Sequence, residues 1–253
     1  MSVQSFQWLF ALSLASLAAS LPSPAIDTSA YRSGSIIKRD VCIIGGGASG
    51  TYAAIGLRDK GKSVAVVEAQ GVLGGHTNTY TDPATKATYD YGVIEFDNTT
   101  TVTSYFARFN VPLTTVSNTA SSALKNYYVD FRTGKNVTGY TPTDPTAAFG
   151  SYAAQLAKYP FLNTPGWDLP DPVPADLLIP FGDFIKKYNL AGAAYTLNEY
   201  AQGFGDLLTI PSLYVLKYFG LSVLEGAQTG FLTTARHDNG ELYEKARAEL
   251  GGK

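Results

Sequence analysis

The pattern of apolar and polar positions after residue 40 predicts a strand, a helix and a second strand. Val41–Ile44 is a continuous apolar run, typical of a strand buried on both faces of a parallel sheet. Residues 51–60 place small and apolar side chains where one helix face can pack on that sheet, and Gly61 follows as a C-terminal cap. Residues 63–67 are mainly Val and Ala and predict the second strand. Together these elements predict a β–α–β unit.

Farther along the chain, the pattern favours a hairpin followed by helices. Residues 126–131 and 135–140 flank a turn that contains Gly134, which predicts a β-hairpin placed to shield a ligand. From Thr143 onward helical patterns dominate, interrupted by the proline-rich loop at residues 160–174. The predicted fold class is therefore α/β, with a parallel sheet, an inserted β-hairpin and a mostly helical region.

Aromatic side chains gather in and between three predicted helices, at residues 181–188, 193–200 and 212–219. They predict either an aromatic helical core, which is the favoured interpretation, or a pocket for a planar apolar substrate. The residues concerned are Tyr188, Tyr195, Tyr200, Phe204, Tyr214, Tyr218 and Phe219.

A last helix is predicted to run from Asp238 to Leu250. Asp238 and Glu241 have the spacing of a capping box, in which each residue would bond to the backbone of the other. His237 directly precedes this cap, and we interpret it as a structural histidine rather than a catalytic base.

Composition narrows the classes of function. The chain has 253 residues, 45% of them hydrophobic and 16% charged, with 25 Gly and 13 Pro, which is typical of a globular protein. The 19 basic and 21 acidic residues give a net charge of -2, so no basic field favours a nucleic-acid partner. Cys42 is the single cysteine, which excludes an intramolecular disulfide and Cys-based zinc sites. We predict no metal site.

The first residues are typical of a secretory signal. Residues 6–19 are uncharged and apolar and end in small residues, which predicts a signal peptide at 1–20 followed by a flexible lead-in at 21–39. The alternative is a buried or interfacial helix. Asn98 and Asn136 begin N-x-Thr sequons, which predict glycosylation of a secreted protein, although chance occurrence is the alternative. No later apolar run has membrane length, so we predict no transmembrane anchor.

The first predicted strand runs directly into a GxGxxG motif. In such a motif Gly45 permits a tight turn, Gly47 lets a pyrophosphate approach the backbone, and Gly50 lets the helix pack close to the strand. The amides at the start of the helix, near Ala48 and Ser49, would face the phosphates. Glu68 ends the second strand, where a carboxylate binds a ribose diol and repels the 2′-phosphate of NADP. The sequence therefore predicts a dinucleotide site that accepts FAD or NAD.

Two further segments resemble the flavin-containing amine oxidase and phytoene desaturase superfamily, and most closely its fungal secreted branch. After Glu68 and Ala69, the triplet Gly74-Gly75-His76 matches a family motif whose backbone lies along the FAD phosphates and flavin, although Val72 stands where many members have Arg. The later segment 89–96 resembles the family strand that passes beside the isoalloxazine, with Gly92 and Val93 at the close approach; an ordinary strand is the alternative. The resemblance implies FAD as the cofactor and a Rossmann-like FAD-binding fold.

The same resemblance implies an FAD-dependent oxidoreductase that moves hydride from a small organic substrate to the flavin. The substrate would be an amine or a secondary-metabolite-like molecule, planar or aromatic, and no catalytic residue can be named. The predicted organisation is an FAD-binding core at 40–125, a substrate or cap region at 126–237, and a returning helix at 238–253. Because the family's chains are longer, the sequence is expected to be a fragment that binds flavin weakly. The alternatives are a truncated, non-catalytic dinucleotide-binding secreted protein and a nicotinamide-dependent dehydrogenase.

Overall fold

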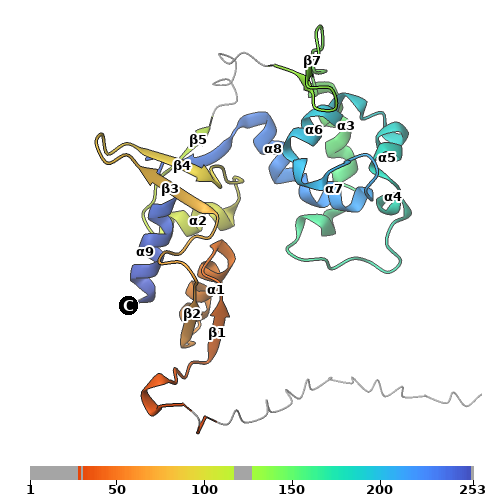
Figure 1. The fold of residues 1–253 in the computed structure, drawn as a ribbon. Helices are drawn as coiled ribbons and strands as arrows, with labels where there is room; N and C mark the ends of the chain where they lie inside the picture. The colour runs from red at the N-terminus through yellow and green to blue at the C-terminus, as the bar shows by residue number, and fades with distance from the viewer. Residues whose placement is uncertain (1–27, 30, 117–126, 252–253) are drawn as a thin grey trace, which may run out of the picture.

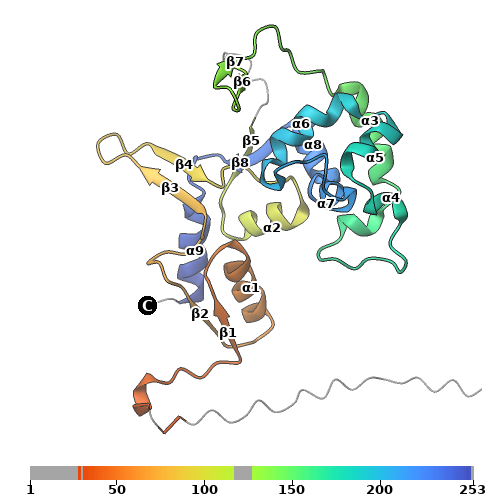
Figure 2. The same cartoon turned by 45° about the vertical axis from the view of Figure 1, so that its right-hand side comes forward.

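The computed structural model describes residues 28, 29, 31–116 and 127–251. The predicted signal peptide at 1–20 and the start of the predicted hairpin at Asn126 lie outside these residues. Figures 1 and 2 show an α/β group on the left, which contains both chain ends of the described part, and a group of helices on the right. None of the described helices is long and apolar enough to cross a membrane.

The predicted β–α–β unit is present. Strands β1 (Val41–Ile44) and β2 (Val64–Val67) pair in parallel and are joined by helix α1 (Ala48–Asp59), which ends before Gly61 at a φ of +74°. The helix begins at Ala48 rather than at residue 51, because Gly47 already has the extended backbone of an N-cap residue.

The prediction that β1 is buried on both faces is wrong for the described residues. Cys42 is exposed and the side chain of Ile44 is 90% exposed. Strand β2 is the one strand paired with β1 among the described residues, so no larger sheet encloses it.

Three two-stranded antiparallel sheets complete the strands. Strand β3 (Thr77–Thr81) pairs with β4 (Thr88–Gly92), β5 (Leu113–Val116) pairs with β8 (Phe231–Thr234), and β6 (Val129–Asp130) pairs with β7 (Lys135–Asn136). The predicted strand at 89–96 therefore ends at Gly92, and Phe96 forms an isolated bridge to Leu232 of β8.

Helices α1, α2 (Thr100–Arg108) and α9 (Gly240–Leu250) enclose the core of the α/β group. Helix α9 begins two residues later than predicted, and only half of the capping box forms. The Asp238 carboxylate accepts from the Glu241 amide at 3.1 Å, whereas the Glu241 carboxylate pairs with Arg236 and Lys245. The buried members of this core are Ile55, Phe106, Phe109, Val111, Leu242, Tyr243 and Ala246.

A separate hydrophobic core lies within the helical group. Its helices are α3 (Thr146–Leu156), α4 (Ala175–Leu178), α5 (Phe181–Tyr188), α6 (Ala194–Tyr200), α7 (Ser212–Tyr218) and α8 (Leu221–Thr229), with short 3-10 turns at Pro160–Asn163, Ala191–Ala193 and Gln202–Phe204. A further 3-10 turn, Ser33–Ser35, precedes β1. Phe219 is fully buried here, and its carbonyl accepts from the Tyr152 hydroxyl at 2.9 Å. The helical-core interpretation of the aromatic residues is confirmed for Phe219, Tyr188, Tyr200 and Phe204, whereas Tyr214 and Tyr218 are 46% and 52% exposed.

The predicted hairpin forms as β6 and β7 but does not shield the glycine motif. It contacts α6 through the rings of Tyr128, Tyr140 and Tyr195. In both views it lies at the top of the molecule, while β1 and the start of α1 lie in the lower part (Figures 1 and 2). Residues 126–140 are therefore placed with the helical group.

Candidate dinucleotide-binding site

The glycine motif forms a tight turn between β1 and α1. Gly45 has a φ of +95°, which a residue with a side chain rarely adopts, and its amide donates to the Val67 carbonyl at 2.8 Å. A Cβ atom added to Gly50 would lie 2.0 Å from the Gly45 carbonyl oxygen. Both glycines are therefore required by the backbone itself, and the turn brings the start of α1 onto the end of the sheet.

The first backbone amides of α1 lie outside the helical hydrogen-bond ladder. The first helical hydrogen bond runs from the Thr51 amide to the Gly47 carbonyl at 2.9 Å, so the amides of Ala48, Ser49 and Gly50 precede the helical ladder. Ala48 and Ser49 are exposed, and the buried Thr51 hydroxyl holds the turn by donating to the Gly46 carbonyl at 2.8 Å. This arrangement suits a phosphate group, since the amides and the helix dipole both favour negative charge.

Glu68 lies beside the same turn. Its two carboxylate oxygens accept from the Gln70 amide at 2.8 Å and the Gly46 amide at 2.6 Å. These backbone hydrogen bonds, first that of Gln70 and then that of Gly46, hold the pKa of Glu68 below its ordinary value. The side chain therefore stays ionised. Because a carboxylate has about four acceptor positions, it can also accept hydrogen bonds from a diol.

The segment Gly74-Gly75-His76 packs directly on the glycine turn. The Gly74 amide donates to the Gly46 carbonyl at 2.8 Å, and Gly74 forms a parallel bridge with Gly47. Gly75 has a φ of +60°, and a Cβ atom on it would lie 3.0 Å from the Gly47 Cα. The structure thus brings two glycine segments together backbone to backbone, and His76 and Ala69 are exposed nearby.

Gly92 and Val93 meet the same segment from the other side. A Cβ atom on Gly92, whose φ is +89°, would lie 2.2 Å from the His76 carbonyl oxygen, and the Val93 amide donates to that oxygen at 3.1 Å. The residues selected from the glycine motif, the second glycine segment and the later strand therefore form one continuous group. His237 lies in the turn before α9, where it has a φ of +51° and its amide donates to the Thr234 carbonyl at 3.0 Å.

A buried asparagine that the sequence analysis did not select fixes the position of Val93. Asn239 is 0% exposed, and its side-chain amide donates to the Val93 carbonyl at 3.1 Å. Its carboxamide oxygen accepts from the Thr234 hydroxyl at 2.9 Å, and its backbone amide donates to Asp90 at 2.8 Å. The local sequence signalled only a helix start, because Asn is common beside N-caps; the link to β4 depends on how α9 packs.

Replacing Asn239 with Ala is expected to lower the free energy of unfolding by about 1–3 kcal/mol, because the Val93 carbonyl and the Thr234 hydroxyl would lose a buried partner. Urea titration followed by circular dichroism measures the change. Replacing the exposed Asn198 with Ala is the matched control and should change stability by less than about 0.5 kcal/mol. Equal effects of the two variants would contradict this role for Asn239.

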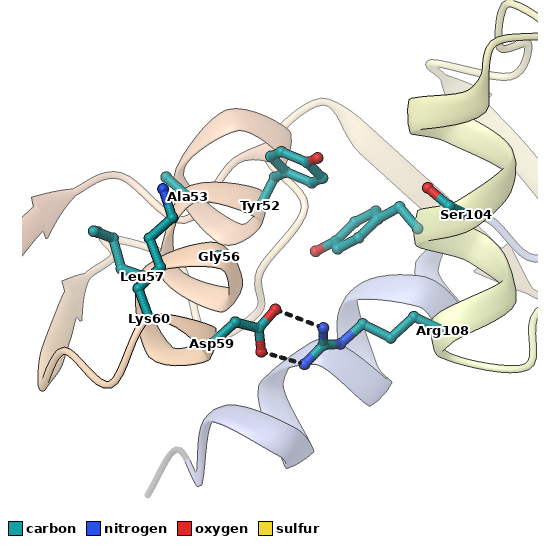
Figure 3. Close-up of a pocket in the computed structure, with 9 residues that line it drawn as sticks. Tyr52, Ala53, Gly56, Leu57, Asp59, Lys60, Ser104 and Arg108 are labelled. Carbon is teal, nitrogen blue, oxygen red and sulfur yellow. Dashed lines mark hydrogen bonds and ion pairs between the residues drawn. The ribbon is translucent and has the colours of Figure 1, made fainter.

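Three cavities surround these elements, and the largest is not at the glycine turn. It measures about 680 Å³ and lies between α1 and α2, where Arg108 pairs with Asp59 at 2.7 Å (Figure 3). A cavity of about 390 Å³ is lined by Glu68, Val66 and Arg247, and one of about 260 Å³ is lined by Ala48 and Ser49. The two smaller cavities therefore flank the turn and are better placed for a dinucleotide.

A basic side chain occurs near Val72, where the family motif often has Arg. Arg247 of α9 donates to the Gly71 carbonyl at 2.5 Å, and both residues line the cavity beside Glu68. A guanidinium thus reaches this loop from another element.

Comparison with known proteins agrees with the geometry. Residues 43–109 match the family described as NAD(P)-binding Rossmann-like domain. The chain is 45% identical to the FAD-dependent oxidoreductase oblC of Cochliobolus heterostrophus, over 99% of this chain and 52% of that protein. It is 40% identical to beta-cyclopiazonate dehydrogenase of Aspergillus oryzae, over 85% of this chain and 46% of that protein.

The chain is homologous to FAD-dependent oxidoreductases. This confirms the resemblance stated from the sequence. The chain spans about half the length of the curated relatives it matches.

Solved structures share the fold. A fatty acid isomerase from P. acnes matches with a TM-score of 0.64 at 22% identity, over 85% of this chain and 51% of that one. Putrescine oxidase bound to putrescine matches with a TM-score of 0.57 at 21% identity, over 85% of this chain and 50% of that one. The predicted α/β, Rossmann-like fold class is confirmed.

Proposed function

We propose that this chain binds the ADP half of FAD and acts in an FAD-dependent oxidoreductase that removes hydride from a small organic substrate. The observation that carries the proposal is the meeting of Gly47, Gly75 and Gly92 with the start of α1 in one group. Side chains larger than hydrogen would collide at Gly50 and Gly92, so these segments are built for close backbone approach.

The residues present fit such a cofactor. The amides of Ala48 and Ser49 would bind the pyrophosphate, and Glu68 would accept hydrogen bonds from the ribose hydroxyls. The backbone at Gly74, Gly75 and His76 would lie along the cofactor, and Gly92 and Val93 would lie near its ring. When bound, FAD supplies the two-electron acceptor for hydride.

The residues of this chain would then position the cofactor. The Glu68 bonds to Gly46 and Gln70 keep the glycine turn in one conformation, so little ordering is needed when a dinucleotide binds. Asn239 holds the carbonyl of Val93, whose amide donates to the His76 carbonyl of the second glycine segment at 3.1 Å. We assign no catalytic acid or base. The substrate is proposed to be a small amine or secondary-metabolite-like molecule, planar or aromatic, in accord with the resemblance.

Absorption spectroscopy with cofactor titration tests this proposal. We expect the purified chain to bind FAD more tightly than NAD, with flavin absorbance retained after gel filtration or restored by added FAD. Binding of NAD with no response to FAD would contradict the proposal and favour a nicotinamide-dependent dehydrogenase. Binding of FAD without substrate oxidation by this chain would support the second candidate, a non-catalytic dinucleotide-binding protein.

We also propose that the protein enters the secretory pathway. The apolar leader at 6–19 supports this proposal, as does the exposure of the two sequon residues Asn98 and Asn136. Expression in a eukaryotic host is expected to give a secreted glycoprotein whose gel mobility increases after glycosidase treatment. The double variant Asn98→Gln, Asn136→Gln should match the deglycosylated form. A cytosolic product with an intact N-terminus and no mobility change would contradict secretion.

A further inference from the structure

The segment at 91–96, which runs from the end of β4 toward α2, combines exposed side chains with a fixed backbone. The side chains of Val93 and Ile94 are 38% and 48% exposed. The carbonyl of Ile94, however, accepts from the Thr233 hydroxyl at 2.9 Å. Phe96 bonds to β8 through both its amide and its carbonyl, at 2.8 and 2.9 Å. The segment therefore presents side chains to solvent from a backbone that other elements hold.

The Asp90 carboxylate joins the first end of this segment to α9. Its Oδ1 atom accepts from the Asn239 amide at 2.8 Å and from the Thr79 hydroxyl at 2.5 Å. The oxygen of the Thr79 hydroxyl in turn accepts from the Gly240 amide at 2.9 Å. Both amides lie at the start of α9, where the helix dipole favours a carboxylate. Asp90 thus holds the end of β4 against the start of this helix.

The Asp97 carboxylate joins the other end of the segment to α8, which belongs to the helical group. Its Oδ2 atom accepts from the hydroxyl of Ser222, in the first turn of α8, at 2.8 Å. Asp97 and Ser222 are both partly buried, and a hydrogen bond is stronger where the local dielectric constant is lower. The start of a second helix therefore holds the segment at its other end.

We propose that Asp90 and Asp97 are positioning residues that hold segment 91–96 at both ends and so fix the backbone beside the proposed ring site. Asp90 ties this backbone to the α/β group, and Asp97 ties it to the helical group, which lies in the predicted substrate or cap region. Neither carboxylate is proposed to touch the cofactor. The inference rests on the proposed function, because the segment has a role beside the ring only if the chain binds FAD.

A segment that is already ordered lowers the cost of binding. Ordering a loop when a ligand binds costs free energy, and hydrogen bonds that exist in the free chain avoid this cost. The hydrogen bonds described above connect the two carboxylates to β3, α8 and α9 rather than to the glycine turn. Loss of either carboxylate is therefore expected to loosen the ring half of the site and to leave the ADP half unchanged.

Hydrogen exchange of the chain without cofactor tests whether the carboxylates hold the segment. Asp90→Ala is expected to speed exchange of the Val93 amide, which donates to a carbonyl of the second glycine segment, by about tenfold or more. Asp97→Ala should have an effect of the same size on the Phe96 amide. Exchange of the Thr51 amide, at the glycine turn, should change less than about twofold in both variants.

Two further variants serve as controls. Asp144→Ala is the matched control, because Asp144 also accepts from a backbone amide and a hydroxyl at a helix start, both of Thr146. It should leave exchange in the segment unchanged. Asp90→Asn keeps an oxygen that can accept from Asn239 and Thr79, and the Oδ2 atom that it replaces makes no hydrogen bond among the described residues. Asp90→Asn should therefore restore most of the protection that Asp90→Ala loses.

Titration with ADP and with FAD tests the effect on the cofactor site. Asp90→Ala and Asp97→Ala are each expected to keep ADP affinity within about twofold of the wild type and to weaken FAD binding about tenfold. The visible absorption bands of the flavin that remains bound should change in shape, because its ring lies against a looser backbone. A variant that is merely less well folded would lose affinity for both ligands.

Unchanged exchange of the Val93 and Phe96 amides would overturn the positioning roles. Equal losses of ADP and FAD affinity, or the same effects in Asp144→Ala, would overturn them as well. A wild-type chain that binds neither ADP nor FAD would contradict the proposed function, and with it the role beside the ring, whatever the exchange measurement shows.

Discussion

Replacing Gly50 with Ala is expected to reduce FAD affinity at least tenfold and to destabilise the α/β group by about 1–3 kcal/mol. The new Cβ atom would lie 2.0 Å from the Gly45 carbonyl oxygen, which is backbone and cannot rotate away. The turn must open, and the amides of Ala48 and Ser49 then lose their fixed direction toward the phosphates. Isothermal calorimetry with FAD and urea titration measure the two effects.

Gly56→Ala is the matched control for this variant. Gly56 lies on the same helix, and a Cβ atom on it would contact nothing within 4 Å. Replacing Gly with Ala in a helix interior is expected to stabilise by about 0.5–1 kcal/mol and should leave FAD affinity unchanged. If Gly50→Ala behaved like Gly56→Ala, the close approach at the glycine turn would not matter for binding.

Replacing Glu68 with Ala is expected to weaken FAD binding by about tenfold to a hundredfold. The variant loses charge-assisted hydrogen bonds to the ribose, worth about 1.5–3 kcal/mol. It also frees the amides of Gly46 and Gln70, which the Glu68 carboxylate now holds at 2.6 and 2.8 Å. Glu68→Gln keeps an acceptor oxygen without the charge and should lose less affinity than Glu68→Ala. Equal affinity of wild type and Glu68→Ala would remove this residue from the site.

The pH dependence of this contact has a defined direction. Backbone hydrogen bonds lower the pKa of Glu68 in the folded chain, so its unfolded value is the higher one. The contribution of Glu68 to the free energy of unfolding is therefore fully present above the unfolded pKa, and it is lost as the pH falls through the lower, folded pKa. Glu68 therefore stays ionised between pH 8 and pH 5. FAD affinity measured over this range should not fall more steeply for the wild type than for Glu68→Gln.

Much of the site was predictable because it depends on local backbone requirements. Gly45 needs a positive φ, Gly50 leaves no room for a side chain, and Glu68 ends a β-branched strand. Each of these demands is visible in a short stretch of sequence. The sequence predicted the start of α1 three residues too late, because glycine has a low helix propensity. Gly50 nevertheless lies in the helix, where it lets the helix pack close to the glycine turn.

The burial of β1 was not predictable from its apolar run. Such a run indicates a strand with both faces buried, but the residues that bury these faces come from other segments of the fold. Within the described residues one face of β1 remains open, and Ile44 is 90% exposed. The packing of the hairpin at 126–140 against α6 was likewise not predictable, because strand and turn propensities do not say which helix a hairpin packs against.

The sequence by itself determined the β–α–β unit, the glycine turn and the acidic residue after β2, since these follow from side-chain size and backbone conformation over a few residues. Only the tertiary structure decided that Gly75 packs on Gly47, that Gly92 meets His76 and that the buried Asn239 holds Val93. These contacts join segments that are far apart in the chain. They depend on how α9 and the β3–β4 hairpin pack, which no local pattern specifies.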